Sequence, residues 1–164
     1  MAELDCIVRG FDPDSKFKNF NSTTHNLFLY QGAIMDVDCP NCPEFPQYTY
    51  EEILKKFGDI GKHVTYLKMD IKGHELSVFP QMFKSNVLEY VDQIGFEVHA
   101  GMFKSRAEME KELKIFFEIL GTLYQKYGFE LASYNPNGCL GKDGDVEKMY
   151  YSYFDVLLVK SPKK

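Results

Sequence analysis

The sequence predicts an α/β fold with a largely parallel sheet. Two apolar runs of strand length, residues 64–71 and 92–98, are almost continuously hydrophobic, which is typical of strands covered on both faces. Further strand-like runs alternate with segments of helical periodicity, as in α/β sandwiches. The last two runs, residues 129–134 and 151–159, have no helical segment between them. We therefore expect an antiparallel hairpin there, with residues 135–148 as its loop.

The first third of the chain supplies two strands and one helix. We expect a strand over residues 4–11, stopped by Pro13, and a second over residues 26–34. The polar segment 15–26 between them indicates a loop or a poor helix. Three prolines within residues 40–46 exclude regular structure there. Thr49 and Glu52 then form a capping box that opens a helix, and Gly58 ends it.

The remaining helices follow the two apolar runs. Gly73 fits a sharp turn into a broken helical stretch, in which Pro80 must lie in a first turn or at a kink. Ser105 and Glu108 form a second capping box, and Gly128 ends the long amphipathic helix that it opens. The apolar positions of this helix, which we expect to pack in the core, are Met109, Leu113, Phe116, Phe117, Leu120, Tyr124 and Tyr127.

Length and charge restrict the class of protein. With 164 residues, the chain is long enough for one domain with a sizeable core. Its formal net charge of −5 argues against nucleic acid as the main partner, because phosphate binding needs a basic surface. No apolar run reaches the length of a membrane span. The N-terminal residues show no basic segment followed by an apolar run, so we expect no targeting signal in this sequence. We expect a soluble protein, cytoplasmic by default.

Four cysteines, at positions 6, 39, 42 and 139, are too few for a disulfide scaffold in a chain of this size. Cys39 and Cys42 form a Cys-x-x-Cys pair in the proline-rich loop. Zinc usually takes four ligands, and no spacing supplies the other two. Free structural thiols, a disulfide, or a redox or metal site remain as alternatives for this pair.

Ionisable residues gather where the two apolar runs end. Asp70 and Glu75 follow the first run, and Glu97 and His99 close the second. Ligands of open α/β sheets bind just beyond the carboxyl ends of the strands, so these four residues are the candidate site. Plainer roles stay open: Asp70 and Glu75 can serve a strand-to-helix turn, and His99 can cap a loop.

Several motifs occur together in one order along nearly the whole chain: Phe11-Asp12-Pro13, Tyr30-Gln31-Gly32-Ala33-Ile34, Thr49-Tyr50-Glu51-Glu52, Asp70-Ile71-Lys72-Gly73-His74-Glu75, Glu97-Val98-His99 and Asn135-Pro136-Asn137. This series resembles the FkbM-like methyltransferases, in particular the branch with an Asp-Ile-Glu-Gly-x-Glu motif and a later Glu-x-His.

The resemblance implies a Rossmann-like class I fold and methyl transfer from S-adenosylmethionine to an oxygen or nitrogen of a small molecule or glycan. Asp12 would bind the ribose hydroxyls, to which a carboxylate is suited; the alternative is an ordinary turn acid before Pro13. Met35 and Asp36 would flank the adenine. The acceptor side would be lined by Asp70, Glu75, Glu97 and His99. One of these would act as general base, or the carboxylates would hold a divalent cation that acidifies the acceptor.

Two departures from the family pattern stand out. Lys72 replaces the glutamate of the Asp-Ile-Glu-Gly motif, which reverses the charge there. The family's first strand and glycine-rich turn have no counterpart, so we expect residues 1–164 to form a single, N-terminally truncated domain. Its unpaired strand edges would favour self-association. The alternative is a non-catalytic module of the same ancestry that has lost cofactor binding.

Overall fold

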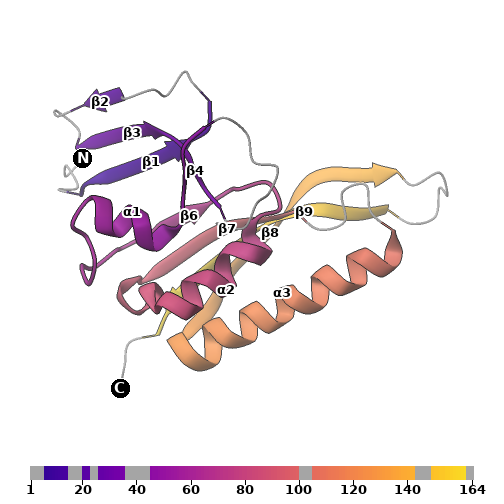
Figure 1. The fold of residues 1–164 in the computed structure, drawn as a ribbon. Coiled ribbons are helices and arrows are strands. Elements are labelled where there is room, and N and C mark those ends of the chain that lie inside the picture. Colours follow the sequence, from indigo (N-terminus) through magenta and orange to yellow (C-terminus); the bar gives the residue numbers. More distant parts are fainter. Residues whose placement is uncertain are drawn as a thin grey trace, which may run out of the picture.

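The computed structural model describes residues 6–14, 20–22, 26–35, 45–99, 105–142 and 149–161. Figure 1 shows their arrangement. In chain order the elements are β1 (Val8–Asp12), β2 (Phe20–Ser22), β3 (Leu27–Gln31), β4 (Ala33–Ile34), β5 (Gln47–Tyr48), α1 (Tyr50–Lys56), β6 (Leu67–Met69), α2 (Glu75–Ser85), the 3-10 helix η3 (Val87–Tyr90), β7 (Gln93–His99), α3 (Arg106–Tyr127), β8 (Phe129–Lys142) and β9 (Met149–Lys160).

Helices and strands alternate along the described residues, so the predicted α/β class is confirmed. The strands form sheets of mixed direction, so a largely parallel sheet is not confirmed. The largest sheet has the order β6-β7-β9-β8. Its β6 and β7 are parallel, whereas β9 is antiparallel to both β7 and β8. A second sheet has the order β1-β3-β2, with β1 and β3 parallel. The short strands β4 and β5 pair in parallel.

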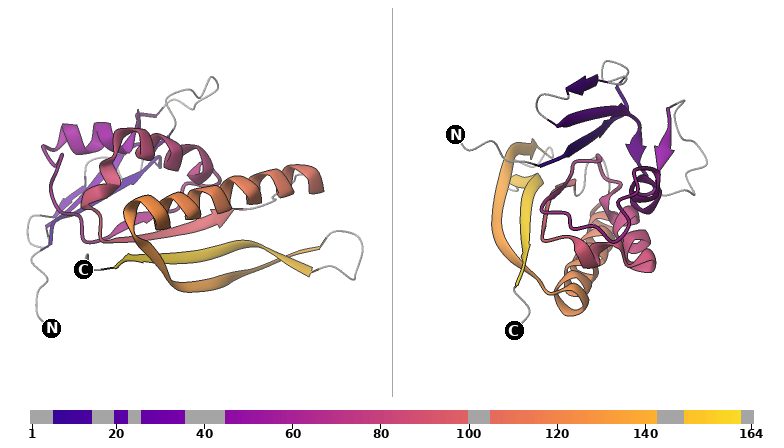
Figure 2. Two further views of the ribbon diagram at one scale, coloured as in Figure 1. Left: turned by 90° about the horizontal axis from the view of Figure 1, so that it is seen from below. Right: turned by 90° about the vertical axis from the view of Figure 1, so that its left-hand side faces the viewer.

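The main core lies between the four-stranded sheet and helices α2 and α3. Both helices cover the same face of this sheet (Figures 1 and 2). Phe96 of β7 connects them, because its ring centroid lies 5.1 Å from that of Phe79 in α2 and 6.1 Å from that of Phe116 in α3. All three side chains are buried. Among the residues that the structure describes, no helix is long and apolar enough to cross a membrane.

The predicted helix ends are confirmed. The Thr49 hydroxyl accepts a hydrogen bond from the Glu52 amide at 3.1 Å, and the Glu52 carboxylate accepts one from the Thr49 amide at 2.8 Å. Ser105 and Glu108 form the same reciprocal pair at the start of α3. Gly128 follows α3 with a φ of 76°, a left-handed conformation that glycine adopts without strain.

The expected antiparallel hairpin is confirmed, but its expected loop is wrong. Pairing with β9 continues through residues 135–142, with register shifts between Leu131 and Ser133 and between Asn137 and Leu140. Such irregularities accommodate an Asn-Pro-Asn segment that looks like a turn in the sequence. The polar segment expected as a loop or poor helix contains β2, which pairs with β3. Backbone pairing, rather than side-chain pattern, supports that short strand.

One expectation for the helices needs correction. Pro80 lies inside α2, beyond its first turn, which excludes the first of the two places expected for it. In α3, Phe116 and Tyr127 are buried as expected, but Phe117 and Tyr124 are 66% and 62% exposed. The sheet covers only one side of this 22-residue helix, so the full set of aromatic positions cannot face the core.

Candidate functional site

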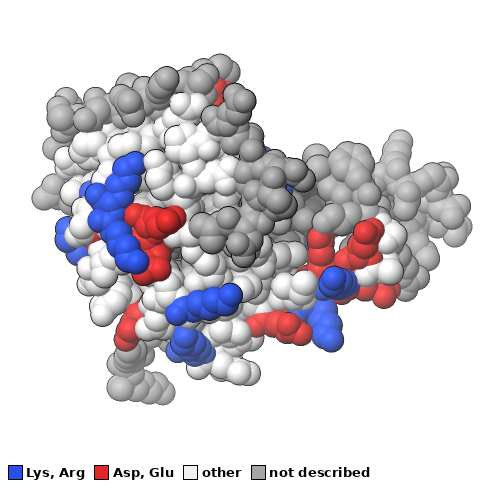
Figure 3. All heavy atoms as spheres, in the orientation of Figure 1, with Lys and Arg blue, Asp and Glu red and all other residues white. Residues whose placement is uncertain are grey.

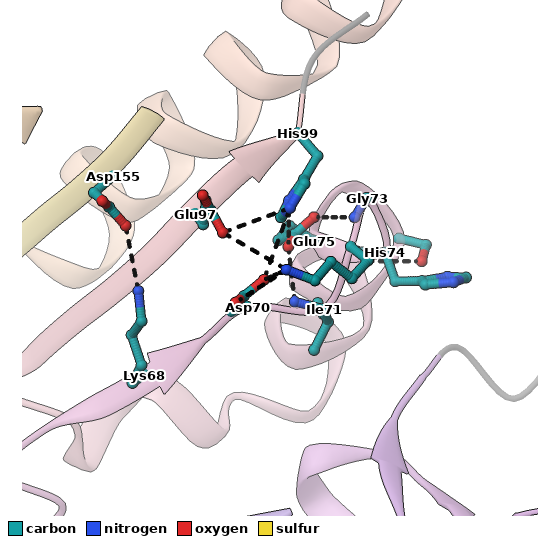
Figure 4. Close-up of polar contacts among 11 residues, drawn as sticks. Lys68, Asp70, Ile71, Gly73, His74, Glu75, Glu97, His99 and Asp155 are labelled. Carbon is teal, nitrogen blue, oxygen red and sulfur yellow. Dashed lines mark hydrogen bonds and ion pairs between the residues drawn. The ribbon is translucent and has the colours of Figure 1, made fainter. Parts of the chain in front are cut away.

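Strand register brings the polar ends of β6 and β7 together. Met69 and Phe96 are partners across this parallel pair, so the residues that follow them, Asp70 and Glu97, lie side by side at one sheet edge. Asp70 leaves the sheet and enters the turn to α2, whereas Glu97 stays within β7. Figure 4 shows both carboxylates directed toward the same space as His99, at the end of β7.

Glu75 organises the turn between β6 and α2. It is the first residue of α2 and only 4% exposed. One carboxylate oxygen accepts a hydrogen bond from the Ile71 amide at 3.0 Å, and the other accepts one from the Gly73 amide at 2.9 Å. Between these two donors Lys72 has a φ of 55°, in the left-handed region. Glu75 therefore has a structural role in the turn, one of the two roles that the sequence left open.

His99 lies between three carboxylates. Its side chain is 7% exposed. The Nδ1 atom lies 3.4 Å from Glu75 Oε1, and Nε2 lies 3.7 Å from Asp70 Oδ1 and 3.6 Å from Glu97 Oε2. The two sides of the imidazole thus face different acids: a buried turn acid on one side, and the strand-end acids on the other.

Lys72 brings a positive charge to the same group. Its Nζ lies 3.0 Å from Asp70 Oδ1 and 4.0 Å from Glu97 Oε2, while its side chain is 72% exposed. Partial burial raises the pKa of Asp70, but the hydrogen bond and charge of Lys72, together with the charge of His99, outweigh it and hold the pKa below its usual value. The hydrogen bond with Asp70 in turn raises the pKa of Lys72. We call Asp70, Lys72, Glu75, Glu97 and His99 the strand-end cluster.

A small pocket adjoins the strand-end cluster on its helical side. Glu75 and His99 contribute to its wall, and Glu112 of α3 adds a further acid. The remaining lining is apolar and comes from α2, β7 and α3: Leu76, Phe79, Phe96, Val98, Leu113, Phe116 and Ile119. The volume of this pocket, about 10 Å³, is close to what a single water molecule requires, so only a small group fits there without movement of the walls.

The residues expected to bind a cofactor lie on other elements. Asp12 ends β1 and is exposed, and its Oδ1 accepts a hydrogen bond from the Asp14 amide at 2.7 Å. This is the ordinary turn contact that the sequence offered as its alternative role. Met35 follows β4 and is 6% exposed. Asp36 lies outside the described residues.

Cys39 and Cys42 lie outside the described residues, and Cys139 belongs to the part of β8 whose side chains are not described. Cys6 is an exposed free thiol.

Sequence reasoning noted Lys72 only as a reversal of charge beside the candidate site, because its pairing with Asp70 depends on the left-handed turn. It missed Glu112. Glu112 lies in the middle of α3, far along the chain from the strand ends, and no local pattern marks it.

Elsewhere on the surface, Lys and Arg side chains lie among Asp and Glu on the face drawn in Figure 3.

No family model, no curated protein and no solved structure matches the chain.

Proposed function

We propose that the chain is an S-adenosylmethionine-dependent methyltransferase domain of FkbM-like type, acting on an oxygen or nitrogen of a small molecule or glycan. The single observation that carries this proposal is the strand-end cluster, in which a buried histidine faces two carboxylates beside a mainly apolar pocket. Two parallel pairs, β1 with β3 and β6 with β7, and the final antiparallel hairpin are compatible with a Rossmann-like class I sheet.

The acceptor side would use the strand-end cluster for proton removal. S-adenosylmethionine, when bound, supplies an electrophilic methyl group. The acceptor hydroxyl or amine must lose a proton as its lone pair attacks that methyl group. His99 Nε2 is suited to take this proton, because Asp70 and Glu97 lie within 3.7 Å and stabilise the imidazolium that forms. Glu75 would orient the ring from the Nδ1 side.

The cofactor side rests on Asp12. Its carboxylate is exposed at the carboxyl end of β1 and makes one turn hydrogen bond through Oδ1. A carboxylate has several acceptor positions, so this turn contact is compatible with binding a ribose hydroxyl as well. Met35 and Asp36 would lie by the adenine.

Calorimetric titration with S-adenosylhomocysteine tests the proposal. We expect micromolar binding to the wild-type chain and a loss of at least tenfold in affinity for Asp12→Ala, because one good polar contact of this kind contributes about 1–3 kcal/mol. Asp14→Ala is the matched control, since it removes a carboxylate from the same turn and keeps the amide that contacts Asp12. A folded chain that gives neither heat nor a thermal shift at millimolar ligand would exclude the enzyme proposal.

A non-catalytic binding module is the second candidate, and Lys72 favours it. Its ammonium group pairs with Asp70 and approaches Glu97, which neutralises charge where a base would act. Restoring the family acid with Lys72→Glu discriminates between the two functions. Methyl transfer that appears only in this variant would indicate that the wild-type chain retains the site architecture without the activity.

A further inference from the structure

We infer that Asp70, Glu97 and His99 form a binding site for a divalent transition-metal ion, with the Lys72 ammonium as a tethered competitor for the same position. This inference rests on the described side chains alone and holds whether or not the chain transfers methyl groups.

The ligand atoms converge on one point. One atom from each of the three residues, a carboxylate oxygen from Asp70 and from Glu97 and an imidazole nitrogen from His99, lies within 4.8 Å of the other two. Metal–ligand bonds of about 2.0–2.2 Å bring ligand atoms to such separations after small side-chain adjustments. The three come from the ends of two adjacent strands, and the remaining coordination positions would be left to water or a ligand.

His99 already has the orientation of a metal-bound histidine. Metal-ligating histidines almost always direct their second ring nitrogen at a carboxylate, a carbonyl or a water molecule, which fixes the ring and the tautomer. Here Nδ1 lies 3.4 Å from Glu75 Oε1, and Glu75 is itself held by the amides of Ile71 and Gly73. With the proton on Nδ1, the Nε2 lone pair faces Asp70 and Glu97. Glu75 is therefore a positioning residue for this site.

The position of Lys72 shows that the two carboxylates attract a cation. Its Nζ lies 3.0 Å from Asp70 and 4.0 Å from Glu97. Because most of the Lys72 side chain is exposed, it can swing into solvent at little cost when a doubly charged ion takes its place.

The ligand set favours a first-row transition metal over magnesium or calcium. Mg²⁺ and Ca²⁺ prefer sites made entirely of oxygen, whereas imidazole suits Zn²⁺, Cu²⁺, Fe²⁺ and Ni²⁺. Mn²⁺ is the better probe for this chain, because the four cysteines could bind Zn²⁺ elsewhere, whereas Mn²⁺ is suited by carboxylates, which supply two of the three ligands here.

The experiment is a titration of the full chain with Mn²⁺, followed by the electron paramagnetic resonance signal of the free ion. We expect Asp70→Asn to weaken binding at least tenfold through loss of a charged ligand, and Lys72→Ala to tighten it about tenfold through loss of the competing charge. Asp155→Asn and Lys68→Ala are the matched controls. Asp155 and Lys68 form a separate ion pair at 3.4 Å beside the cluster (Figure 4). The two control variants change the net charge by the same amounts as Asp70→Asn and Lys72→Ala, and they should leave the Mn²⁺ affinity nearly unchanged.

Three outcomes would overturn the inference. One is the absence of Mn²⁺ binding at millimolar concentration in the Lys72→Ala variant. Another is an equal effect of Asp70→Asn and Asp155→Asn, which would mean that only net charge matters. The third is an equal effect of Lys72→Ala and Lys68→Ala. Asp70 is 40% exposed, so Asp70→Asn should fold, and far-ultraviolet circular dichroism confirms this for each variant.

Discussion

Asp70 and Glu75 show how two acids of one short motif acquire different roles. Glu75 is buried and gives both carboxylate oxygens to backbone amides of the turn that it follows. Leaving two partly buried amides without acceptors would cost free energy, so the turn itself explains why an acid is needed there. Asp70 is partly exposed, and its carboxylate interacts with the side chains of Lys72, His99 and Glu97. Of the two, Asp70 is the acid available to a ligand.

At the residue scale, Tyr50 should make stability depend on alkaline pH. Burial and the charge of Asp59 raise the pKa of this phenol to about 12. An unfolded chain releases the same proton near pH 10. Between these values the unfolded state binds fewer protons than the folded state, so the free energy of unfolding falls as pH rises. Tyr50→Phe should remove this component, which amounts to about 1 kcal/mol at pH 11.

Urea unfolding of wild type and Tyr50→Phe at pH 8 and at pH 11 measures this difference. Comparing the two proteins at each pH cancels the titration of the other groups. If the stability difference between them is the same at both values, the folded phenol titrates as it does in the unfolded chain, and the expectation is wrong.

The sequence could indicate which residues meet in the strand-end cluster, but not how they are oriented. Parallel strands share one edge for their carboxyl ends, so Asp70, Glu97 and His99 could be placed together from the order of the runs. The position of Lys72 depends on a left-handed φ of 55°, which sequence rules assign to glycine or asparagine. Likewise, the orientation of His99 depends on Glu75, whose burial follows from packing rather than from local pattern.

Elements defined by local rules were predicted best. Capping boxes depend on residues three positions apart, and both were confirmed. The strands of the hairpin were found, but the extent of their pairing was not, because pairing through residues 135–142 depends on β9, which comes later in the chain. For the same reason β2, which depends on its pairing with β3, was missed.

At the element scale, Pro80→Ala should stabilise the protein. Pro80 lies inside α2 and is exposed, so alanine would leave no cavity and would restore a donor for the Leu76 carbonyl. The gain in helix propensity is about 3 kcal/mol. About 1 kcal/mol of this is offset, because proline also restricts the unfolded chain. We expect a net rise of about 1–2 kcal/mol in the free energy of unfolding.

Chemical denaturation checks this gain against Lys84→Ala, an exposed change in the same helix that should stay within about 0.5 kcal/mol of wild type. A loss of stability in Pro80→Ala would contradict this expectation. It would mean that the backbone conformation that Pro80 imposes on α2 is needed to pack the buried side chains of Val78 and Met82.

Over the whole molecule, the described core is unevenly distributed. Buried residues concentrate around the four-stranded sheet, α2 and α3, whereas every β3 residue is only half-buried. The β1–β3 sheet is held instead by an aromatic group, in which the rings of Tyr30 and Phe57 lie 4.8 Å apart, and by an ion pair between Arg9 and Asp59 at 2.5 Å. Hydrophobic runs predict where strands form but not which strands pair with each other. The division of the strands into separate sheets therefore could not be predicted from the sequence.

This distribution predicts that the two sheets open at different free energies. Amides of β7 and β9 should exchange only by global unfolding, whereas those of β1 and β3 should exchange through a local opening that is at least about 1–2 kcal/mol easier. Native-state hydrogen exchange, followed by mass spectrometry, separates the two sets.

Arg9→Ala should accelerate exchange in β1 and β3 and leave exchange in β7 and β9 unchanged. Lys62→Ala is the control, because it removes the other, mostly exposed cation that contacts Asp59. Exchange of all four strands at one rate, or equal effects of the two variants, would mean that the sheets unfold as a single cooperative unit.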